Sequence, residues 1–351
     1  MKNVLFATTA LVAASVAGSA YAASHTSLGW SAEVTAGYND DEEGGMFVDA
    51  NATINGTLTT SSGITLGLSY GIEFNGTDGF SPDDFATFTA ESSAGKLTIG
   101  EVGDFAAEKN WNTISKEGFD TDFNEEDGEF AIDFTGNFNG FQYGVSSVIG
   151  DGTGAGSDLT GLSLGVSGAV GAFKFGLGFE EDGFDTGVAS LDDHPDTMGL
   201  GVETTFGAAT IALAFIDADV NTSTGVLVKY DLGNGIDLGA YYTMNDNAGV
   251  SNDAYGAWVG YSMDPIKVKL AFDTQEDLDP DNRIIVTAEY AMAPATIFAG
   301  YSTDSVNDGS YIGVDVDLGN DATLTVSYAE FDEAFGREFN VGTSAYINVK
   351  F

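Results

Sequence analysis

Carboxylates dominate the reactive side chains of this chain of 351 residues. It has 54 Asp and Glu against 11 Lys and Arg, a formal net charge of −43 at pH 7, two His and no Cys. Without cysteine, disulfides, thiolate metal sites and cysteine nucleophiles are impossible. The pI near 4.1 leaves phosphate groups almost no counter-charge, so nucleic acid is not an expected partner.

The carboxylates have few partners for catalysis. The two histidines are His25 and His194, and Asp193 next to His194 forms an Asp–His pair. Such a pair is an arrangement that general-base catalysis uses. A single histidine in a loop is far more often an ordinary surface residue, so we expect no enzyme.

Acidic clusters are the arrangement with potential metal chemistry, because carboxylate oxygens suit Ca²⁺ and Mg²⁺. The clusters lie at residues 40–43, 125–127 and 192–193. The acidic run at residues 277–281 resembles the start of a calcium loop. It has Asn282 where the loop needs Gly and Ala288 where it needs Glu, so it is not an EF-hand. Two interpretations stay open: bound Ca²⁺ or Mg²⁺ that bridges neighbouring molecules, and solvated loop acids on a protein adapted to salty water. The metal ligands are unknown, and no cofactor is expected.

Residues 1–22 are a predicted signal peptide. Lys2 gives a short positive start, residues 4–17 are an apolar run, and residues 20–22 form an Ala-x-Ala cleavage site. The apolar run is short for a membrane-spanning helix. We therefore predict cleavage after Ala22, export to a Gram-negative envelope, and a mature domain of residues 23–351.

The elements that must position the charges are amphipathic strands. Runs of about ten residues alternate apolar and polar side chains; in residues 323–328, Leu, Val and Tyr alternate with Thr, Thr and Ser. Period-two alternation indicates strands with one apolar and one polar face. Short turns, such as residues 233–235, alternate with longer acidic loops, such as residues 181–194. This rhythm predicts an all-β, antiparallel up-and-down barrel of about 16–20 strands.

The apolar faces of such a barrel point either to a soluble core or to lipid. Large apolar side chains on nearly every strand, opposite faces rich in Gly, Thr and Asp, favour lipid. A barrel of this size leaves an aqueous channel. The chain also ends in an amphipathic strand, residues 341–351, whose last residue is Phe351. A terminal aromatic of this kind resembles the assembly signal of outer-membrane proteins. The alternative is an exported acidic β-protein, such as a surface adhesin or a structural outer-membrane protein without an open pore.

Residues 101–128 break the strand alternation and are too long for a turn. The run of residues 95–97 into 100–104, Gly-Lys-Leu then Gly-Glu-Val-Gly-Asp, leads into them. Together with residues 1–6 (Met-Lys-Asn-Val-Leu-Phe) and 348–351 (Asn-Val-Lys-Phe), it resembles the general diffusion porins of Rhodobacter-type α-proteobacteria. Between these three places the resemblance is one of rhythm. In that family the loop after the fifth strand folds into the barrel, narrows the pore, and faces a cluster of bases with its acids.

The resemblance implies that residues 101–128 are an inward-folded constriction loop. The pore-facing acids it implies are Asp104, Glu108, Asp120, Asp122, Glu125, Glu126 and Asp127. It further implies a homotrimer in the outer membrane, among its lipids. Divalent cations on the acidic clusters would bridge to lipopolysaccharide or between subunits. The sequence departs from the family where the arginine cluster usually sits, because residues 23–95 contain no Lys or Arg. We therefore expect no opposing-charge eyelet.

Strand alternation assigns further charges to the lumen. The assigned acids are Asp133, Asp231, Asp237, Asp273, Glu289, Asp315 and Asp317. The assigned bases are Lys96, Lys174, Lys229, Lys267 and Lys269. Their balance is negative, and a low-dielectric tube lined by one sign of charge concentrates the opposite ion. The predicted function is a passive outer-membrane porin for ions and small hydrophilic solutes, with a preference for cations.

Overall fold

The protein is described by a computed structural model of the chain. The described residues are 25–40, 45–75, 79–82, 86–119, 121–123, 129–149, 159–181, 196–219, 221–274, 282–303, 309–330 and 341–351. The predicted signal peptide, residues 1–22, lies outside them, so its cleavage stays a prediction.

The described residues form strands almost throughout. These are β1 (His25–Asn39), β2 (Gly45–Thr59), β3 (Thr65–Asn75), β4 (Gly79–Pro82), β5 (Thr87–Ser92), β6 (Gly95–Val102), β7 (Glu129–Phe138), β8 (Phe141–Ile149), β9 (Leu159–Val170), β10 (Phe173–Glu180), β11 (Thr197–Phe206), β12 (Ala209–Ala218), β13 (Asn221–Gly233), β14 (Ile236–Asn247), β15 (Val250–Ser251), β16 (Ala254–Met263), β17 (Ile266–Thr274), β18 (Asn282–Met292), β19 (Ala295–Thr303), β20 (Gly309–Gly319), β21 (Ala322–Ala329) and β22 (Gly342–Lys350). One short helix, α2 (Ala106–Trp111), follows β6 in the described part of the chain.

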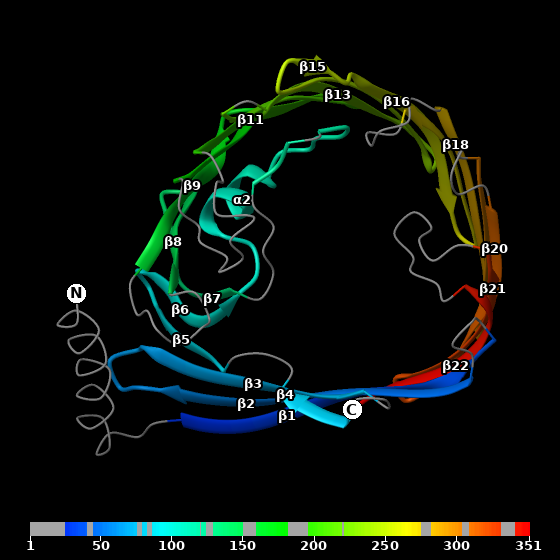
Figure 1. The fold of residues 1–351 in the computed structure, drawn as a ribbon, viewed down its shortest axis with the longest axis horizontal. Helices are drawn as coiled ribbons and strands as arrows, with labels where there is room; N and C mark the ends of the chain where they lie inside the picture. The colour runs from blue at the N-terminus through cyan, green and yellow to red at the C-terminus, as the bar shows by residue number, and fades with distance from the viewer. Residues whose placement is uncertain are drawn as a thin grey trace.

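Antiparallel pairing runs from each strand to the next and closes the sheet. Residues 33–39 of β1 pair with residues 344–350 of β22, so the wall is a complete ring (Figure 1). The short strands β4 and β15 do not add positions to the ring, because β3 also pairs with β5 and β14 also pairs with β16. Among the described residues the wall therefore has twenty strands. The predicted antiparallel barrel is confirmed, at the upper end of the predicted range.

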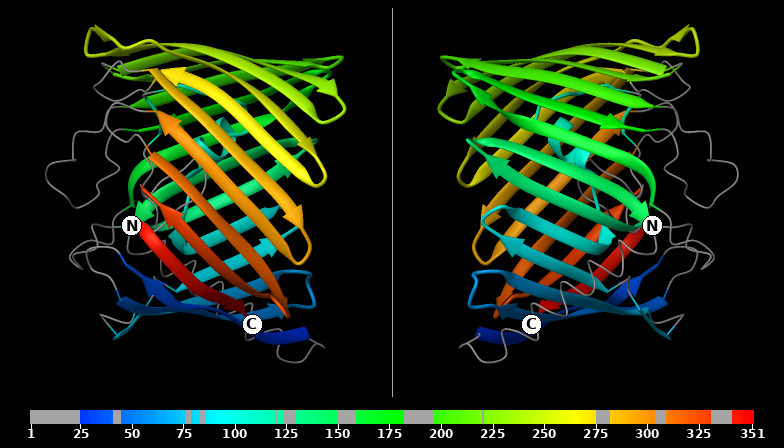
Figure 2. Two further views of the ribbon diagram at one scale, coloured as in Figure 1. Left: turned by 90° about the vertical axis from the view of Figure 1, so that its right-hand side faces the viewer. Right: turned by 90° about the vertical axis from the view of Figure 1, so that its left-hand side faces the viewer.

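The strands are steeply tilted to the barrel axis (Figure 2). Twenty strands about 4.8 Å apart and tilted by about 40° give a circumference of roughly 125 Å and a backbone diameter of about 40 Å. Inward side chains cannot fill a ring of this size. Tight hairpins such as Asn139-Gly140 and Asn234-Gly235, with positive φ at both residues, join strands at one end of the ring.

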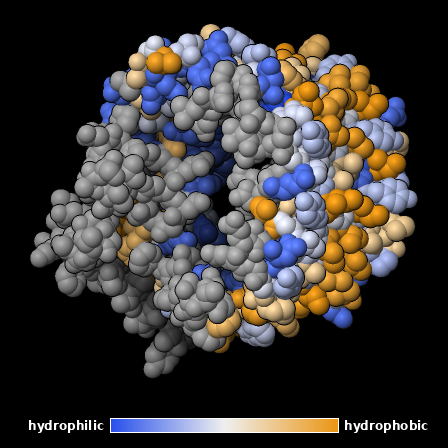
Figure 3. Space-filling model, turned by 45° about the vertical axis from the view of Figure 1, so that its right-hand side comes forward, coloured by the Kyte–Doolittle hydropathy of each residue, from blue (hydrophilic) through white to orange (hydrophobic). Residues whose placement is uncertain are grey.

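The outer surface carries the large apolar side chains. On β12, Ile211 and Leu213 are 41% and 57% exposed, whereas Ala212 and Ala214 on the opposite face are buried. Figure 3 shows apolar residues spread over the outer wall and hydrophilic residues in the hollow. This polarity is the reverse of a soluble β-sandwich, whose large apolar side chains point inward. Among the described residues, no helix has the length and apolarity to cross a membrane.

Candidate functional site: the lumen and its inner loop

The chain between β6 and β7 turns into the barrel. Helix α2 lies inside the ring, next to β8–β11 (Figure 1). Where β6 ends, Val102 of this strand and Phe105 form a buried cluster with Ala131 and Val148 of the wall. We use the name inner loop for its described residues, 103–119 and 121–123. They belong to the segment 101–128 that the sequence singled out as a constriction loop.

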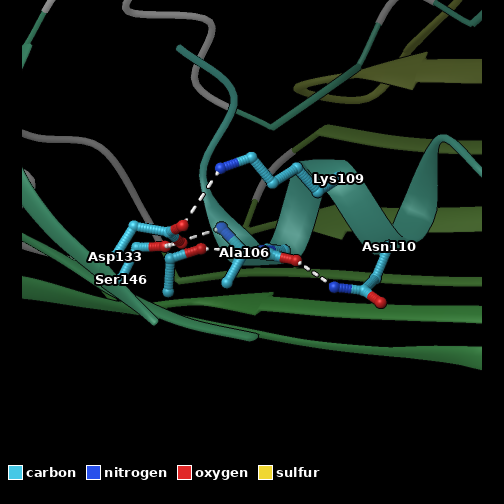
Figure 4. Close-up of polar contacts among 7 residues, drawn as sticks. Ala106, Lys109, Asn110, Asp133 and Ser146 are labelled. Carbon is cyan, nitrogen blue, oxygen red and sulfur yellow. Dashed lines mark hydrogen bonds and ion pairs between the residues drawn. The ribbon is translucent and has the colours of Figure 1, made fainter. Parts of the chain in front are cut away.

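Wall serines fix the beginning of helix α2. Ser146 and Ser163 accept hydrogen bonds from the backbone N–H groups of Ala106 and Ala107, each at 2.9 Å. These are two of the N–H groups that the first helical turn cannot satisfy itself. One turn later, Asn110 donates to the Ala106 carbonyl at 2.8 Å (Figure 4). Its side-chain oxygen accepts from Ser167 at 2.8 Å. The wall therefore holds the helix through buried hydrogen bonds.

Glycines on the inner wall leave room for the inner loop. A Cβ added at Gly178 would lie 2.6 Å from Phe123, and one at Gly201 would lie 2.9 Å from Ile114. The same close approach holds along a track of seven glycines on neighbouring strands: Gly144, Gly165, Gly176, Gly178, Gly199, Gly201 and Gly225. A side chain at these positions would occupy the space that the loop fills. The loop and the wall are therefore shaped to each other.

Apolar side chains of the inner loop fill the space above this track. Trp111 and Phe123 pack with Ala214 and Ile216 of the wall, and Phe119 packs against the same cluster. The Trp111 and Phe123 rings are 6.2 Å apart in an edge-to-face arrangement. Each such buried side chain stabilises the docked loop by about 1.5–3 kcal/mol.

Polar contacts continue along the inner loop to the far side of its docking surface. Ser115 N–H donates to Glu203 on β11 at 3.3 Å. Thr243 on β14 donates to the Glu117 carbonyl at 2.7 Å, and Asn245 donates to the Gly118 carbonyl at 2.9 Å. The inner loop therefore crosses the inner wall from β8 to β14 and covers a large part of it.

The predicted pore-facing acids fall into three groups. Asp104 and Asp122 are exposed on the inner loop. Glu108 is only 5% exposed and accepts a hydrogen bond from Asn112 at 3.1 Å, so the structure corrects its predicted position on the open pore. The reason is that Glu108 belongs to helix α2, which docks on the wall and buries this side chain. The sequence of a loop without strand periodicity does not reveal such docking. Asp120, Glu125, Glu126 and Asp127 lie outside the described residues.

The strand register shows which wall residues share the face that the inner loop contacts. Ser146, which bonds the loop, lies opposite Asp133 on β7, and successive partners around the ring extend this inner face. All twelve residues assigned to the lumen from the alternation lie on it: Asp133, Asp231, Asp237, Asp273, Glu289, Asp315, Asp317, Lys96, Lys174, Lys229, Lys267 and Lys269. Asp133 is buried under the loop rather than open to the channel.

Ion pairs neutralise part of the lumen acid. Four join neighbouring wall strands, and three of these are formed by lysines: Lys174 to Glu203 at 3.0 Å, Lys267 to Glu289 at 3.0 Å and Lys350 to Glu33 at 3.3 Å. Arg283 bonds Asp273 through both carboxylate oxygens, at 2.9 and 3.1 Å. Lys109 of the inner loop reaches Asp133 at 3.4 Å (Figure 4).

Every described base lies on the lumen side. Seven are on the inner face of the wall and two, Lys109 and Lys116, are on the inner loop. Four of these bases are not among the predicted lumen residues: Lys109, Lys116, Arg283 and Lys350. Strand alternation alone would have placed Arg283 and Lys350 in the lumen, whereas the two loop lysines follow no strand period.

An aromatic side chain that is not among the predicted lumen residues also lies on the inner face. Trp258 lies on the inner face, donates to Asp237 at 3.2 Å, and has the Lys269 ammonium 5.7 Å from its ring centre. No group of three potential metal-ligating side chains occurs among the described residues. The acidic clusters at residues 41–43, 125–127 and 192–193 lie outside them, so cation binding there stays untested.

The match to a family model agrees with the barrel fold. A family model described as Gram-negative porin matches residues 7–336. Among solved structures, a triple mutant of the porin of Rhodopseudomonas blastica is 17% identical, with 93% of this chain and 100% of that chain covered and a TM-score of 0.43. Another mutant of that porin is 16% identical over the same shares, with a TM-score of 0.44. No curated protein matches this chain.

Proposed function

Because the chain belongs to the Gram-negative porin family and forms an outer-membrane channel, we propose that its pore prefers cations and that the inner loop sets its size limit. Ions and small hydrophilic solutes cross the water-filled lumen down their gradients, without chemical turnover. The signal peptide of residues 1–22 and assembly into a homotrimer, with lipopolysaccharide around it, belong to the same proposal.

The distribution of lumen charge carries the cation preference. Inner-face acids outnumber the bases among the described residues, and five of the nine described bases are already in ion pairs with carboxylates. The exposed Asp104 and Asp122 add negative charge on the loop that narrows the channel. In a tube with low-dielectric walls, such fixed charge raises the local concentration of cations and lowers that of anions.

Neutralising the two exposed loop acids is expected to weaken the preference. The double variant Asp104→Asn with Asp122→Asn should lower the potassium-to-chloride permeability ratio by about twofold, measured as reversal potential under a KCl gradient. The measurement belongs near 0.1 M salt, where the screening length is about 10 Å and the fixed charges are still felt.

The matched control removes two acids from the outer face. Asp217 and Asp246 both lie in register with Thr222, on the face away from the lumen. The double variant Asp217→Asn with Asp246→Asn loses the same charge and should leave the reversal potential unchanged. Anion preference in the unmodified protein would overturn the proposed selectivity while leaving the channel intact.

A further inference from the structure

A polar cavity of about 440 Å³ lies between helix α2 and strands β5–β8. Its charged lining residues are Lys96, Lys109 and Glu91, and amide side chains of Asn110, Asn137 and Gln142 complete much of the polar surface. The described lining residues therefore carry one net positive charge, in a chain whose formal net charge is −43. The two lysines of this lining come from different elements, Lys96 from the wall and Lys109 from the inner loop.

We propose that this cavity binds small solutes that carry carboxylate groups. Ammonium and amide N–H groups are the donors that a carboxylate accepts, and charge-assisted hydrogen bonds of this kind are among the strongest in proteins. The proposal is independent of the cation preference, because a local positive site and a negative lumen average can coexist. A solute anion would then bind at this cavity inside a pore whose overall charge repels it.

The contacts of Lys109 leave it able to donate into the cavity. Its ammonium group has three N–H donors. Its ion pair to Asp133 is 3.4 Å long, against about 2.7–2.9 Å for a close charge-assisted bond. Asp133 accepts a shorter hydrogen bond from Ser146, at 2.7 Å. The Lys109 side chain keeps a third of its surface exposed.

The amides and Lys96 point to the same chemistry. The oxygen of Asn137 accepts from Gly140 N–H at 3.3 Å, which leaves its NH₂ group as the end that donates. Lys96 is exposed on the inner face, with Glu91 and Thr135 as its neighbours in register. Glu91 is the one acid among the described lining residues, and its negative charge weakens anion binding there.

The test is a block of KCl current through the pore by added succinate. Succinate should reduce single-channel current in a saturable manner, and succinamide, its neutral analogue, should not. In Lys96→Gln the half-blocking concentration of succinate should rise about tenfold, the loss expected for one charge-assisted hydrogen bond. In Glu91→Gln it should fall severalfold, because the repelling charge is gone.

Lys267→Gln is the matched control, because Lys267 also lies on the inner face and belongs to a wall ion pair, outside the cavity lining. It should change the half-blocking concentration by less than about twofold. Equal shifts of the half-blocking concentration in Lys96→Gln and Lys267→Gln would show that the block depends on the overall electrostatic field of the lumen, and would overturn the proposed binding site. So would the absence of block, or equal block by succinamide. None of these outcomes bears on the reversal potential in KCl, which tests the cation preference separately.

Discussion

Leucine at both Gly199 and Gly201 is expected to push the inner loop off the wall and to raise single-channel conductance by about twofold or more. A Cβ at these positions would lie 2.8 Å from Phe123 and 2.9 Å from Trp111 and Ile114, and a leucine adds three further carbons. The wall backbone is tied into two ladders, to β10 and β12, so the loop is the part that moves. Displacement forfeits the burial of large side chains, at about 1.5–3 kcal/mol each.

The conductance gain follows from the space that the loop occupies. A helix with its side chains is about 10–12 Å across, a substantial share of a lumen inside a ring of about 40 Å backbone diameter. Single-channel conductance in KCl and the cutoff for neutral polymers should therefore rise together. Displacement would also expose Glu180 and Glu203, now buried on the wall, and so strengthen the proposed cation preference.

Gly29→Leu is the control for the added bulk. Gly29 lies on the inner face opposite Asn55, and a Cβ there meets nothing within 4 Å. Leucine at this position should leave the loop docked and lower conductance slightly. Unchanged conductance and cutoff in the Gly199 and Gly201 double variant would contradict the docking argument.

The strands of the wall can be predicted from sequence, because period-two alternation indicates both that a segment is a strand and which of its side chains share a face. Residues 323–328 alternate so regularly that the strand and its inner face follow at once. Strand number is less determined. The sequence between β4 and β5, and that between β15 and β16, interrupts the alternation. Only the strand pairing shows that each of these two pairs of strands occupies one position in the ring.

The inner loop could be located but not built from sequence. Its lack of alternation marks the segment, yet the burial of Glu108 depends on how a six-residue helix docks. Glycines such as Gly176 and Gly199 are visible in the sequence, but a track emerges only when the register places them on neighbouring strands. The cross-strand ion pairs also depend on the register. Alternation assigns Lys267 and Glu289 to one face, but only the strand pairing shows that they are neighbours.

Deletion of Phe351 is expected to lower the amount of folded barrel in the outer membrane by about tenfold or more. Its N–H donates to the Ala32 carbonyl at 2.8 Å, and its carbonyl accepts from Ala32 N–H at 3.3 Å. These bonds extend the seam between β1 and β22, whose ladder has seven residue pairs, against fifteen between β1 and β2. Each hydrogen bond contributes about 1 kcal/mol, and an unpaired strand end is an edge open to aggregation.

Two substitutions separate the backbone from the ring of Phe351. Phe351→Ala keeps both seam hydrogen bonds and loses the aromatic side chain, which is 65% exposed on the outer face. Phe351→Tyr keeps both the seam hydrogen bonds and an aromatic side chain.

The measurement is the amount of barrel in isolated outer membranes that resists SDS until it is heated. Loss in Phe351→Ala, with Phe351→Tyr unaffected, assigns assembly to recognition of the aromatic ring. Loss only in the deletion assigns it to closure of the seam, where Asn348 also bonds Glu33 and Thr35. Normal amounts of folded barrel in all three variants would show that Phe351 has no role in assembly.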